Sequence, residues 1–311
     1  MIPYIKLFRP LNLLIIAFTQ YLILYCVIRP FMSVSFVDLQ IGYIDFGLFV
    51  LANVLLAAAG YAINDYYDVG CDAVNKPDKN MLLGKIPRKH AYTLNFILNS
   101  VACIIGFYCA YKVGTLKLGF LFIIVALVLF YYSLKYKRQF LTGNIVVGIL
   151  AAYCVASVWL FHFFALKANP EAFTDLIGSF GIITIFVGGY AVFAFIINFL
   201  REIVKDVEDL DGDKEYGFNT LPVRKGVKYA KSIVLALCIL AMILLGVVQF
   251  FLFESYTMLS YYLFVIQILF IYLIIKTLKS NEKSDFHLLS IFSKIIMIAG
   301  LLSTQLLYIY F

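Results

Sequence analysis

The stretch AINDYYDVGCDAVNKPD, residues 62–78, places a cluster of carboxylates at the end of a long apolar run. At about 100° per residue, Asp65, Asp68 and Asp72 fall on one face of a helix. We name these three residues the first Asp motif. Three carboxylates at the end of a membrane helix are energetically costly unless a cation lies among them, so we expect this face to hold one.

The same spacing of three and four residues returns in Asp206, Asp209 and Asp213, which we name the second Asp motif. Eleven of the 18 acidic residues lie in the two windows 65–78 and 202–215, unlike the spread of a solvated surface. Mg²⁺ prefers oxygen ligands and usually joins one or two carboxylates to the phosphate oxygens of a substrate. Two matched motifs facing one cavity therefore predict a Mg²⁺-dependent site for a phosphate or diphosphate.

The composition is that of an integral membrane protein. Of 311 residues, 63% are hydrophobic and 14% are charged, whereas a soluble domain is roughly 45–50% apolar and about 25% charged. The net charge of +7 does not indicate nucleic-acid binding, because the basic residues lie in loops between apolar runs, where membrane topology explains them. The length predicts a single transmembrane domain over residues 1–311. The six cysteines lack C-x-x-C spacing and are expected to be small buried hydrophobic residues.

Nine apolar runs are long enough to cross a hydrocarbon core of about 30 Å, which takes roughly 20 helical residues. They predict an all-α polytopic bundle, because a transmembrane barrel would show short alternating segments. The first run is expected to be a membrane helix and not a cleaved signal peptide, since no small-residue cleavage site follows it. The predicted spans are 11–29, 44–66, 92–112, 115–134, 143–165, 175–203, 229–252, 256–276 and 287–310.

The distribution of Lys and Arg predicts the orientation in the membrane. Twenty of the 25 lie at the N-terminus or in loops on the same side of the membrane, and four lie on the opposite side. Loops rich in Lys and Arg face the cytoplasm. We therefore expect the N-terminus and both Asp motifs on the cytoplasmic side.

The second Asp motif belongs to a longer polar helix face. Helical phasing adds Asn198 and Glu202 to this face, and Arg201 and Lys205 flank it. Basic side chains are expected beside the metals if a diphosphate lies over them, because its charge must be neutralised as it leaves. The alternative is a juxtamembrane helix stabilised by pairs of opposite charge one turn apart. The matching first motif favours the site.

Further basic and aromatic candidates follow the ends of apolar runs. Lys79 follows the first Asp motif and Lys135 follows the fourth predicted span, and both are candidates to bind a diphosphate. Tyr131, one helical turn before Lys135, is a candidate to line the mouth of a pocket. The positive-inside rule and the interfacial belt of aromatic residues are the alternative explanations for these positions.

Several motifs of the chain are together typical of one family. They are R-P-L-N at 9–12, N-D-Y-Y-D-V-G-C-D at 64–72, N-K-P-D-K at 75–79, Tyr131 with Lys135, G-N at 143–144 and D-V-E-D-L-D-G-D at 206–213. The chain resembles the UbiA superfamily of intramembrane prenyltransferases, and within it the digeranylgeranylglyceryl phosphate synthases and their bacterial relatives look most similar. The loop at 76–80 departs from the family's frequent Arg-Pro-x-Arg-Pro, and its lysines keep the charge of arginine without the two-pronged hydrogen bonding.

This resemblance implies a helical bundle with a lipid-open cavity and site residues at matching positions. The catalytic residues would be Asp68, Asp72, Asp209 and Asp213. One Mg²⁺ would be held by Asn64, Asp68 and Asp72 and another by Asp206, Asp209 and Asp213, with Asp65 as a further ligand or behind the ligands. The substrate-binding residues would be Arg9, Asn12, Lys79, Tyr131, Lys135, Arg201 and Lys205.

The activity that the resemblance implies is Mg²⁺-dependent transfer of a prenyl group, geranylgeranyl in the similar synthases, from its diphosphate to a lipid hydroxyl such as that of geranylgeranylglyceryl phosphate. An aromatic acceptor (4-hydroxybenzoate or another quinone precursor) and a chlorin stay open as alternatives. An ion-coupled transporter is the non-enzyme alternative, but its site would lie near the middle of the bilayer. A CDP-alcohol phosphotransferase is disfavoured, because Glu208 stands where the motif D-x-x-D-G-x-x-A-R begins with Asp. Membrane lipid is the expected environment, and neither a nucleic acid nor an obligatory protein partner is indicated.

Overall fold

The computed structural model describes residues 2–77 and 80–310 of the chain. The secondary structure over those residues is helical, without a strand. The helices are α1 Ile2–Leu7, α2 Pro10–Leu22, η1 Ile23–Ile28, α3 Arg29–Val34, α4 Tyr43–Asn75, α5 Arg88–Lys112, η2 Leu116–Leu118, α6 Gly119–Leu134, η3 Tyr136–Arg138, α7 Thr142–Lys167, α8 Pro170–Leu176, η4 Ile177–Ser179, α9 Phe180–Glu208, α10 Leu210–Glu215, α11 Leu221–Lys225, α12 Val227–Leu252, α13 Thr257–Lys279 and α14 Lys283–Tyr308.

The nine predicted spans are confirmed. Over residues 2–77 and 80–310, nine helical segments are long and apolar enough to cross a membrane, and the chain is an all-α integral membrane protein. The first span combines α2, η1 and α3, because the helix widens to a π-helical turn at Ile23–Ile28. Pro30 follows this turn and has no backbone N–H to bond the preceding helical turn, which accounts for the widening.

Helix α4 continues well beyond the predicted end of the second span at residue 66. It reaches Asn75, so the whole first Asp motif is helical. The apolar run stops at the first carboxylate, but the helix stops only where Lys76 leaves helical geometry, at φ −152° and ψ 61°. Lys76 precedes Pro77, and the proline ring disfavours helical geometry in the residue before it.

Helix α9 ends earlier than the helical phasing of the second Asp motif required. The helix stops at Glu208, and Asp209 joins it to the separate short helix α10. The prediction that Asp206, Asp209 and Asp213 share one helix face is therefore wrong. The break turns the three side chains toward different neighbours.

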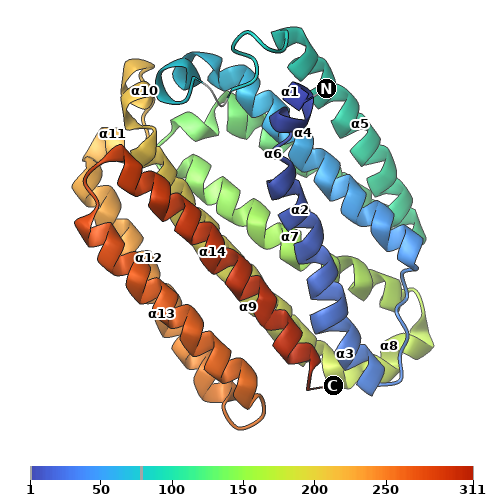
Figure 1. Ribbon diagram of the computed structural model, residues 1–311. Helices are drawn as coiled ribbons and strands as arrows, with labels where there is room; N and C mark the ends of the chain where they lie inside the picture. Colours follow the sequence, from blue (N-terminus) through green and yellow to red (C-terminus); the bar gives the residue numbers. More distant parts are fainter. Residues whose placement is uncertain (1, 78–79, 311) are drawn as a thin grey trace.

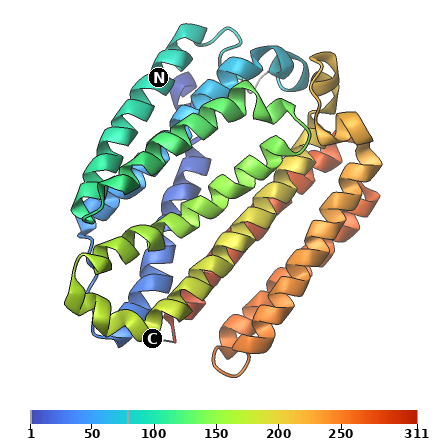
Figure 2. The same ribbon diagram turned by 180° about the vertical axis from the view of Figure 1, so that it is seen from behind.

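The spans stand side by side in one bundle (Figure 1). Helix α5 forms one edge and the pair α12–α13 forms the other, and the view from behind shows α7 and α9 between them (Figure 2). Helix α4 packs against α5 and α6, and α9 packs against α7, α12 and α14. Since α2 contacts both α4 and α7, the helices α2, α4, α7, α9 and α14 enclose the centre of the bundle.

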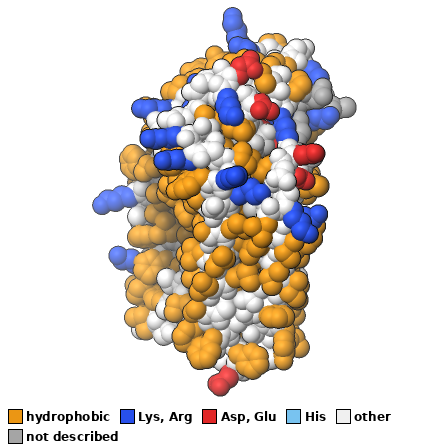
Figure 3. Space-filling view, turned by 90° about the vertical axis from the view of Figure 1, so that its left-hand side faces the viewer, with side chains coloured by type: hydrophobic (Ala, Val, Ile, Leu, Met, Phe, Trp, Pro, Cys, Tyr) orange, Lys and Arg blue, Asp and Glu red, His pale blue; other side chains and the backbone are white. Residues whose placement is uncertain are grey.

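Charged side chains gather at one end of the molecule. The face shown in Figure 3 is mainly hydrophobic over its lower part, and Lys, Arg, Asp and Glu crowd its upper part. An apolar band below a charged end is the surface expected of a bundle that spans a bilayer. The end of α4, which carries the first Asp motif, and α10, which follows α9 in the second motif, lie at this end (Figure 1).

Candidate active site

One cavity of about 600 Å³ occupies the centre of the bundle, between α2, α4, α6, α7, α9 and α14. Its volume is within the usual range for a site that encloses a small molecule. One end is lined by carboxylates and basic side chains, including Asp68 and Asp209. The other end is lined mainly by apolar groups, among them Ile23, Leu56 and Leu301. A charged head with a long apolar tail would match this division.

The first Asp motif faces this cavity as predicted. Asp65, Asp68 and Asp72 all line it, together with Asn64. Asp68 is 2% exposed and accepts hydrogen bonds from Asn64 Nδ2, at 2.7 Å, and from Lys137 Nζ. Because the Asn64 amide donates through its nitrogen, its carbonyl oxygen is left as an additional ligand.

Lys137 supplies the buried positive charge beside the first motif. Burial by itself lowers the pKa of its ammonium group, but the neighbouring Asp68, Tyr132 and Asp72 raise that pKa well above its usual value. Lys137 is therefore charged. A cation does lie among these carboxylates, as the cost of burying them requires.

Asp65 faces away from Lys137 and toward the N-terminal segment. Arg9 Nη2 donates to Asp65 Oδ1 at 2.6 Å, and its guanidinium lies 4.9 Å from the centre of the Tyr61 ring. Arg9 has φ 52° and ψ 63°, a left-handed conformation that is strained for a side chain of this size. The ion pair and the ring contact stabilise this turn between α1 and α2, so Asp65 acts as the partner of Arg9.

The second Asp motif is divided among three environments. Asp209 lines the cavity and lies within 2.7 Å of Lys76 Nζ through both carboxylate oxygens. Asp206 instead accepts a hydrogen bond from Asn144 Nδ2 at 2.7 Å. Asp213 is 4% exposed and lies behind the cavity surface. The break after α9 gives the three carboxylates different partners, and of the three only Asp209 lines the cavity, so the assignment of all three to one metal ion stays a prediction.

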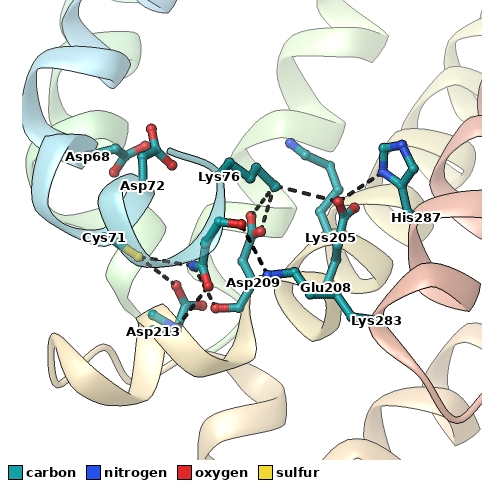
Figure 4. A network of polar contacts seen from close by, with 12 residues as sticks. Asp68, Cys71, Asp72, Lys76, Lys205, Glu208, Asp209, Asp213, Lys283 and His287 are labelled. Atoms are coloured by element: carbon teal, nitrogen blue, oxygen red, sulfur yellow. Dashed lines mark hydrogen bonds and ion pairs between the residues drawn. The ribbon is translucent and has the colours of Figure 1, made fainter. Parts of the chain in front are cut away.

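Asp213 is held beside the end of α4 by side-chain hydrogen bonds. Its carboxylate accepts a hydrogen bond from Cys71 Sγ at 3.5 Å (Figure 4). Thr220 Oγ1 donates a second hydrogen bond to it at 3.1 Å. Burial raises the pKa of Asp213 to about 6, although Lys137 and these two donors favour the charged form. A divalent cation near this carboxylate would favour its ionised form.

Asn75 fastens the two motifs together. Its Nδ2 donates to the carbonyl of Asp209 at 2.8 Å, and its Oδ1 accepts from the backbone N–H of Gly212 at 2.9 Å. A Cβ on residue 212 would lie 2.4 Å from the Asn75 side chain, so glycine is required there. The end of α4 and the start of α10 are thereby held at a fixed separation.

We expect Asn75→Ala to loosen this connection. The Gly212 N–H loses its side-chain acceptor, while the Asp209 carbonyl keeps its hydrogen bond from the Asp213 N–H, so the expected cost is about 1–3 kcal/mol. The apparent melting temperature in detergent should fall, and the rate of any reaction catalysed at this site should fall by roughly tenfold. The control is Asn219→Ala, at an exposed asparagine in the same region. Unchanged stability and rate for Asn75→Ala would contradict the role given to this side chain.

Charged and polar side chains from α9 and α14 meet at the outer edge of the cavity. Glu208 Oε1 is 2.9 Å from His287 Nδ1 on α14 and 3.9 Å from Lys76 Nζ (Figure 4). Lys283 Nζ donates to the carbonyl of Asn75 at 3.1 Å. The start of α14 therefore packs against both motifs. The spacing of the Asp residues alone gave no sign of this contribution from the last span.

Two of the predicted substrate-binding residues lie outside this cavity. Tyr131 and Lys135 are exposed and lie outside its wall, while Tyr132 and Lys137 line it. Lys79 falls outside the described residues. Lys137 lines the cavity in place of the predicted Lys135 because η3 turns the chain after α6. A Cβ on residue 143 would lie 2.8 Å from Lys137 Cα, so Gly143 permits this close approach.

The remaining predicted substrate-binding residues do line the cavity. They are Arg9, Asn12, Arg201 and Lys205. Arg201 and Lys205 share the buried carboxylate of Glu202, at 3.3 Å and 2.9 Å. Lys294 on α14, which the sequence shows as a lone cation inside an apolar run, joins them. An ionisable residue inside a membrane span is itself a sign of function.

The donor chemistry of the charged end suits Mg²⁺. Carboxylate oxygens of Asp68, Asp72 and Asp209, with the Asn64 carbonyl, line one space, and ammonium groups already lie against Asp68 and Asp209. Over residues 2–77 and 80–310, no three Asp, Glu, His or Cys groups are close enough to hold one ion by themselves. Mg²⁺ commonly takes one or two carboxylates and completes its shell with water and substrate phosphate, and this arrangement fits that pattern.

Comparison with known proteins gives a consistent family match. Residues 32–295 match the UbiA prenyltransferase family. A digeranylgeranylglyceryl phosphate synthase from Methanosphaera stadtmanae is 28% identical over 301 residues, which cover 97% of each chain. A solved structure that concerns digeranylgeranylglyceryl phosphate synthase in membranes is 26% identical to this chain. Its TM-score is 0.63, and the match covers 99% of this chain and 98% of that one. A UbiA homologue from Archaeoglobus fulgidus bound to GPP and Mg²⁺ is similar in fold, at 18% identity and a TM-score of 0.53 over 97% and 99% of the two chains.

Proposed function

Because this chain belongs to the UbiA prenyltransferase family, we propose that it transfers a geranylgeranyl group from its diphosphate to the hydroxyl of a lipid such as geranylgeranylglyceryl phosphate. The observation that carries the proposal is the division of one cavity into a carboxylate and ammonium end and a long apolar end. The similarity to digeranylgeranylglyceryl phosphate synthases over almost the full length supports the choice of acceptor. We assign the whole chain, residues 1–311, to this one catalytic domain.

The charged end of the cavity is proposed to bind the diphosphate with Mg²⁺. Asn64, Asp68 and Asp72 would hold the metal on the α4 side, and Asp209 would hold it on the α9 side, with Asp213 close behind. Bound Mg²⁺ supplies positive charge that stabilises the departing diphosphate. Lys137 and Lys76 extend that positive charge, because their ammonium groups already lie against carboxylates that line the same space.

The apolar end is proposed to bind the prenyl chain. Its lining by Ile23, Leu56, Leu129 and Leu301 offers an apolar surface and excludes water from the reactive carbon. In the reaction, the carbon–oxygen bond to the diphosphate breaks and a carbon–oxygen bond to the acceptor hydroxyl forms. The products are the prenyl ether, diphosphate and the hydroxyl proton. The ring of Tyr132, which lines the cavity beside Lys137, can stabilise positive charge on the allylic carbon.

We infer a cytoplasmic location for the charged end. The excess of Lys and Arg in the loops at this end supports the inference. The diphosphate donor would then reach the site from the cytoplasmic side, while the prenyl chain and the acceptor lipid remain in the bilayer.

The direct test is a transfer assay on the purified protein in detergent with Mg²⁺ and radiolabelled geranylgeranyl diphosphate. Geranylgeranylglyceryl phosphate and 4-hydroxybenzoate are offered in separate reactions, each with an EDTA control. We expect a labelled phospholipid from the first reaction and none when EDTA is present. A labelled ring from the second reaction alone would overturn the choice of a lipid acceptor, and product formation in EDTA would overturn the Mg²⁺ requirement.

A further inference from the structure

A group of four cationic side chains lines the same cavity beside the Asp motifs and extends from them into the bundle. It consists of Arg9 before α2, Arg201 and Lys205 on α9, and Lys294 on α14. Arg201 lies eight residues before Asp209, which is roughly 12 Å along a helix axis at 1.5 Å per residue. A direct ionic contact reaches about 4 Å. Arg201 therefore lies beyond the direct reach of a group bound at Asp209, whereas Lys205, one helical turn before Asp209, lies between the two.

The carboxylates around this group do not balance its charge. Arg9 pairs with Asp65, and Arg201 and Lys205 share Glu202. Lys294 has no carboxylate partner among the described residues. Four cationic side chains thus face two carboxylates, which leaves a formal charge of +2. Unbalanced charge inside a membrane bundle is costly and calls for an anion.

Lys294 shows the imbalance most clearly. Its Nζ donates to the neutral Oδ1 of Asn12 at 3.2 Å. It lies within electrostatic range of three other cations, namely Arg201, Lys205 and Arg9. Glu202, which Arg201 and Lys205 already share, is the carboxylate within electrostatic range of Lys294. An anion that enters the cavity would therefore find the Lys294 ammonium without a carboxylate of its own.

Arg201, which lines the same cavity as Lys294, carries a hydrogen-bond donor without a partner. Its Nη1 is 3.3 Å from Glu202 Oε1, but its Nε is buried and has no partner among residues 2–77 and 80–310. The side chain is 16% exposed and lines the cavity. A buried N–H without a partner destabilises the protein, because it has lost its hydrogen bond to water. An anion in the cavity would remove that cost.

We propose that Arg201, Lys205 and Lys294, with Arg9 at the rim, form a phosphomonoester subsite for the acceptor lipid. A phosphate monoester carries a charge of about −1.5 to −2 at pH 7 and three acceptor oxygens, which matches the excess charge and the free donors. This inference rests on the proposed function and adds to it. The diphosphate of the donor binds at the Asp motifs, and the phosphate of the acceptor binds at this separate inner group.

The test compares two acceptors that differ only in the phosphate, geranylgeranylglyceryl phosphate and geranylgeranylglycerol. For Lys294→Met we expect the KM for the phosphorylated acceptor to rise roughly ten- to hundredfold, as for the loss of one charged hydrogen bond. The KM for geranylgeranyl diphosphate should change less than threefold. Preference for the phosphorylated acceptor should fall by the same factor, and Lys294→Arg should restore most of it.

Matched variants keep the test decisive. Lys228→Met, at an exposed lysine at the start of α12, should leave both KM values unchanged. Arg201→Gln should repeat the effect of Lys294→Met if the latter fails to fold. Binding is also measured without turnover, as the rise in melting temperature caused by geranylgeranylglyceryl phosphate in EDTA, which Lys294→Met should abolish.

The outcomes separate the two proposals. If the wild-type protein forms no product from the phosphorylated acceptor, the proposed function fails. If product forms but Lys294→Met and Arg201→Gln leave the acceptor KM and the thermal shift unchanged, the inner subsite fails alone. A rise in the KM for geranylgeranyl diphosphate in place of the acceptor KM would also overturn it, by assigning these cations to the donor.

Discussion

Prenyl transfer is expected to fall by roughly 10³-fold or more when either Asp68 or Asp209 is replaced by asparagine. Each substitution keeps the size of the side chain and removes one negative charge from the charged end of the cavity. Asp68 is nearly inaccessible, at 2% exposure, and Asp209 faces it from the other Asp motif. Loss of either carboxylate leaves one side of the proposed Mg²⁺ site without its anionic ligand.

The assay is the initial rate with geranylgeranyl diphosphate and the phosphorylated acceptor over a series of Mg²⁺ concentrations. Size-exclusion chromatography and melting curves in detergent establish that each variant is folded. Asp211→Asn is the matched control, because Asp211 is an exposed carboxylate two residues after Asp209. It should retain the wild-type rate. If both Asp68→Asn and Asp209→Asn also retained it, the metal assignment would be withdrawn.

The sequence was sufficient for the spans and for one face of the site. Nine apolar runs predict nine membrane helices, because a helix in lipid must satisfy its own backbone groups over a fixed length. The direction in which Asp65, Asp68 and Asp72 point was also predictable, since all three lie within the single uninterrupted helix α4. Periodicity is reliable when no break interrupts the helix.

The side-chain directions of the second Asp motif were less predictable, because a break does interrupt the helix there. The break at Asp209 depends on contacts with a distant part of the chain, where Asn75 bonds both Asp209 and Gly212. Once the helix stops, the phase that relates Asp206 to Asp213 is lost. Helix propensity is a weak guide beside such tertiary contacts, so the matching spacing of the two motifs suggested a symmetry that the side chains do not have.

The choice between Lys135 and Lys137 was likewise beyond the reach of the sequence pattern. Both lysines follow the same apolar run, and the positive-inside rule explains either one. Their difference is set by η3 and by the close approach of Gly143, which together turn Lys137 toward Asp68. The pair therefore offers a direct test of the structure, because two lysines two residues apart receive opposite roles.

Lys137→Met is expected to reduce prenyl transfer by roughly 10²-fold or more, whereas Lys135→Met should leave the rate within twofold of wild type. Lys137 supplies charge beside Asp68 and the diphosphate, and one preorganised donor of this kind contributes about 10²–10³ in rate. Lys135 is exposed and lies outside the cavity wall. Equal effects of the two substitutions would contradict this arrangement.

The stability of Lys137→Met should reveal the same contact without reference to catalysis. Removing the ammonium leaves the buried Asp68 carboxylate without its basic partner, and such a loss costs about 3–5 kcal/mol. The melting temperature should therefore fall in EDTA and recover when Mg²⁺ supplies the missing positive charge. Gly143→Val should imitate both effects, because any side chain at that position displaces the backbone of Lys137. A Gly143→Val protein with normal rate and normal stability would show that Lys137 does not depend on this turn to reach Asp68.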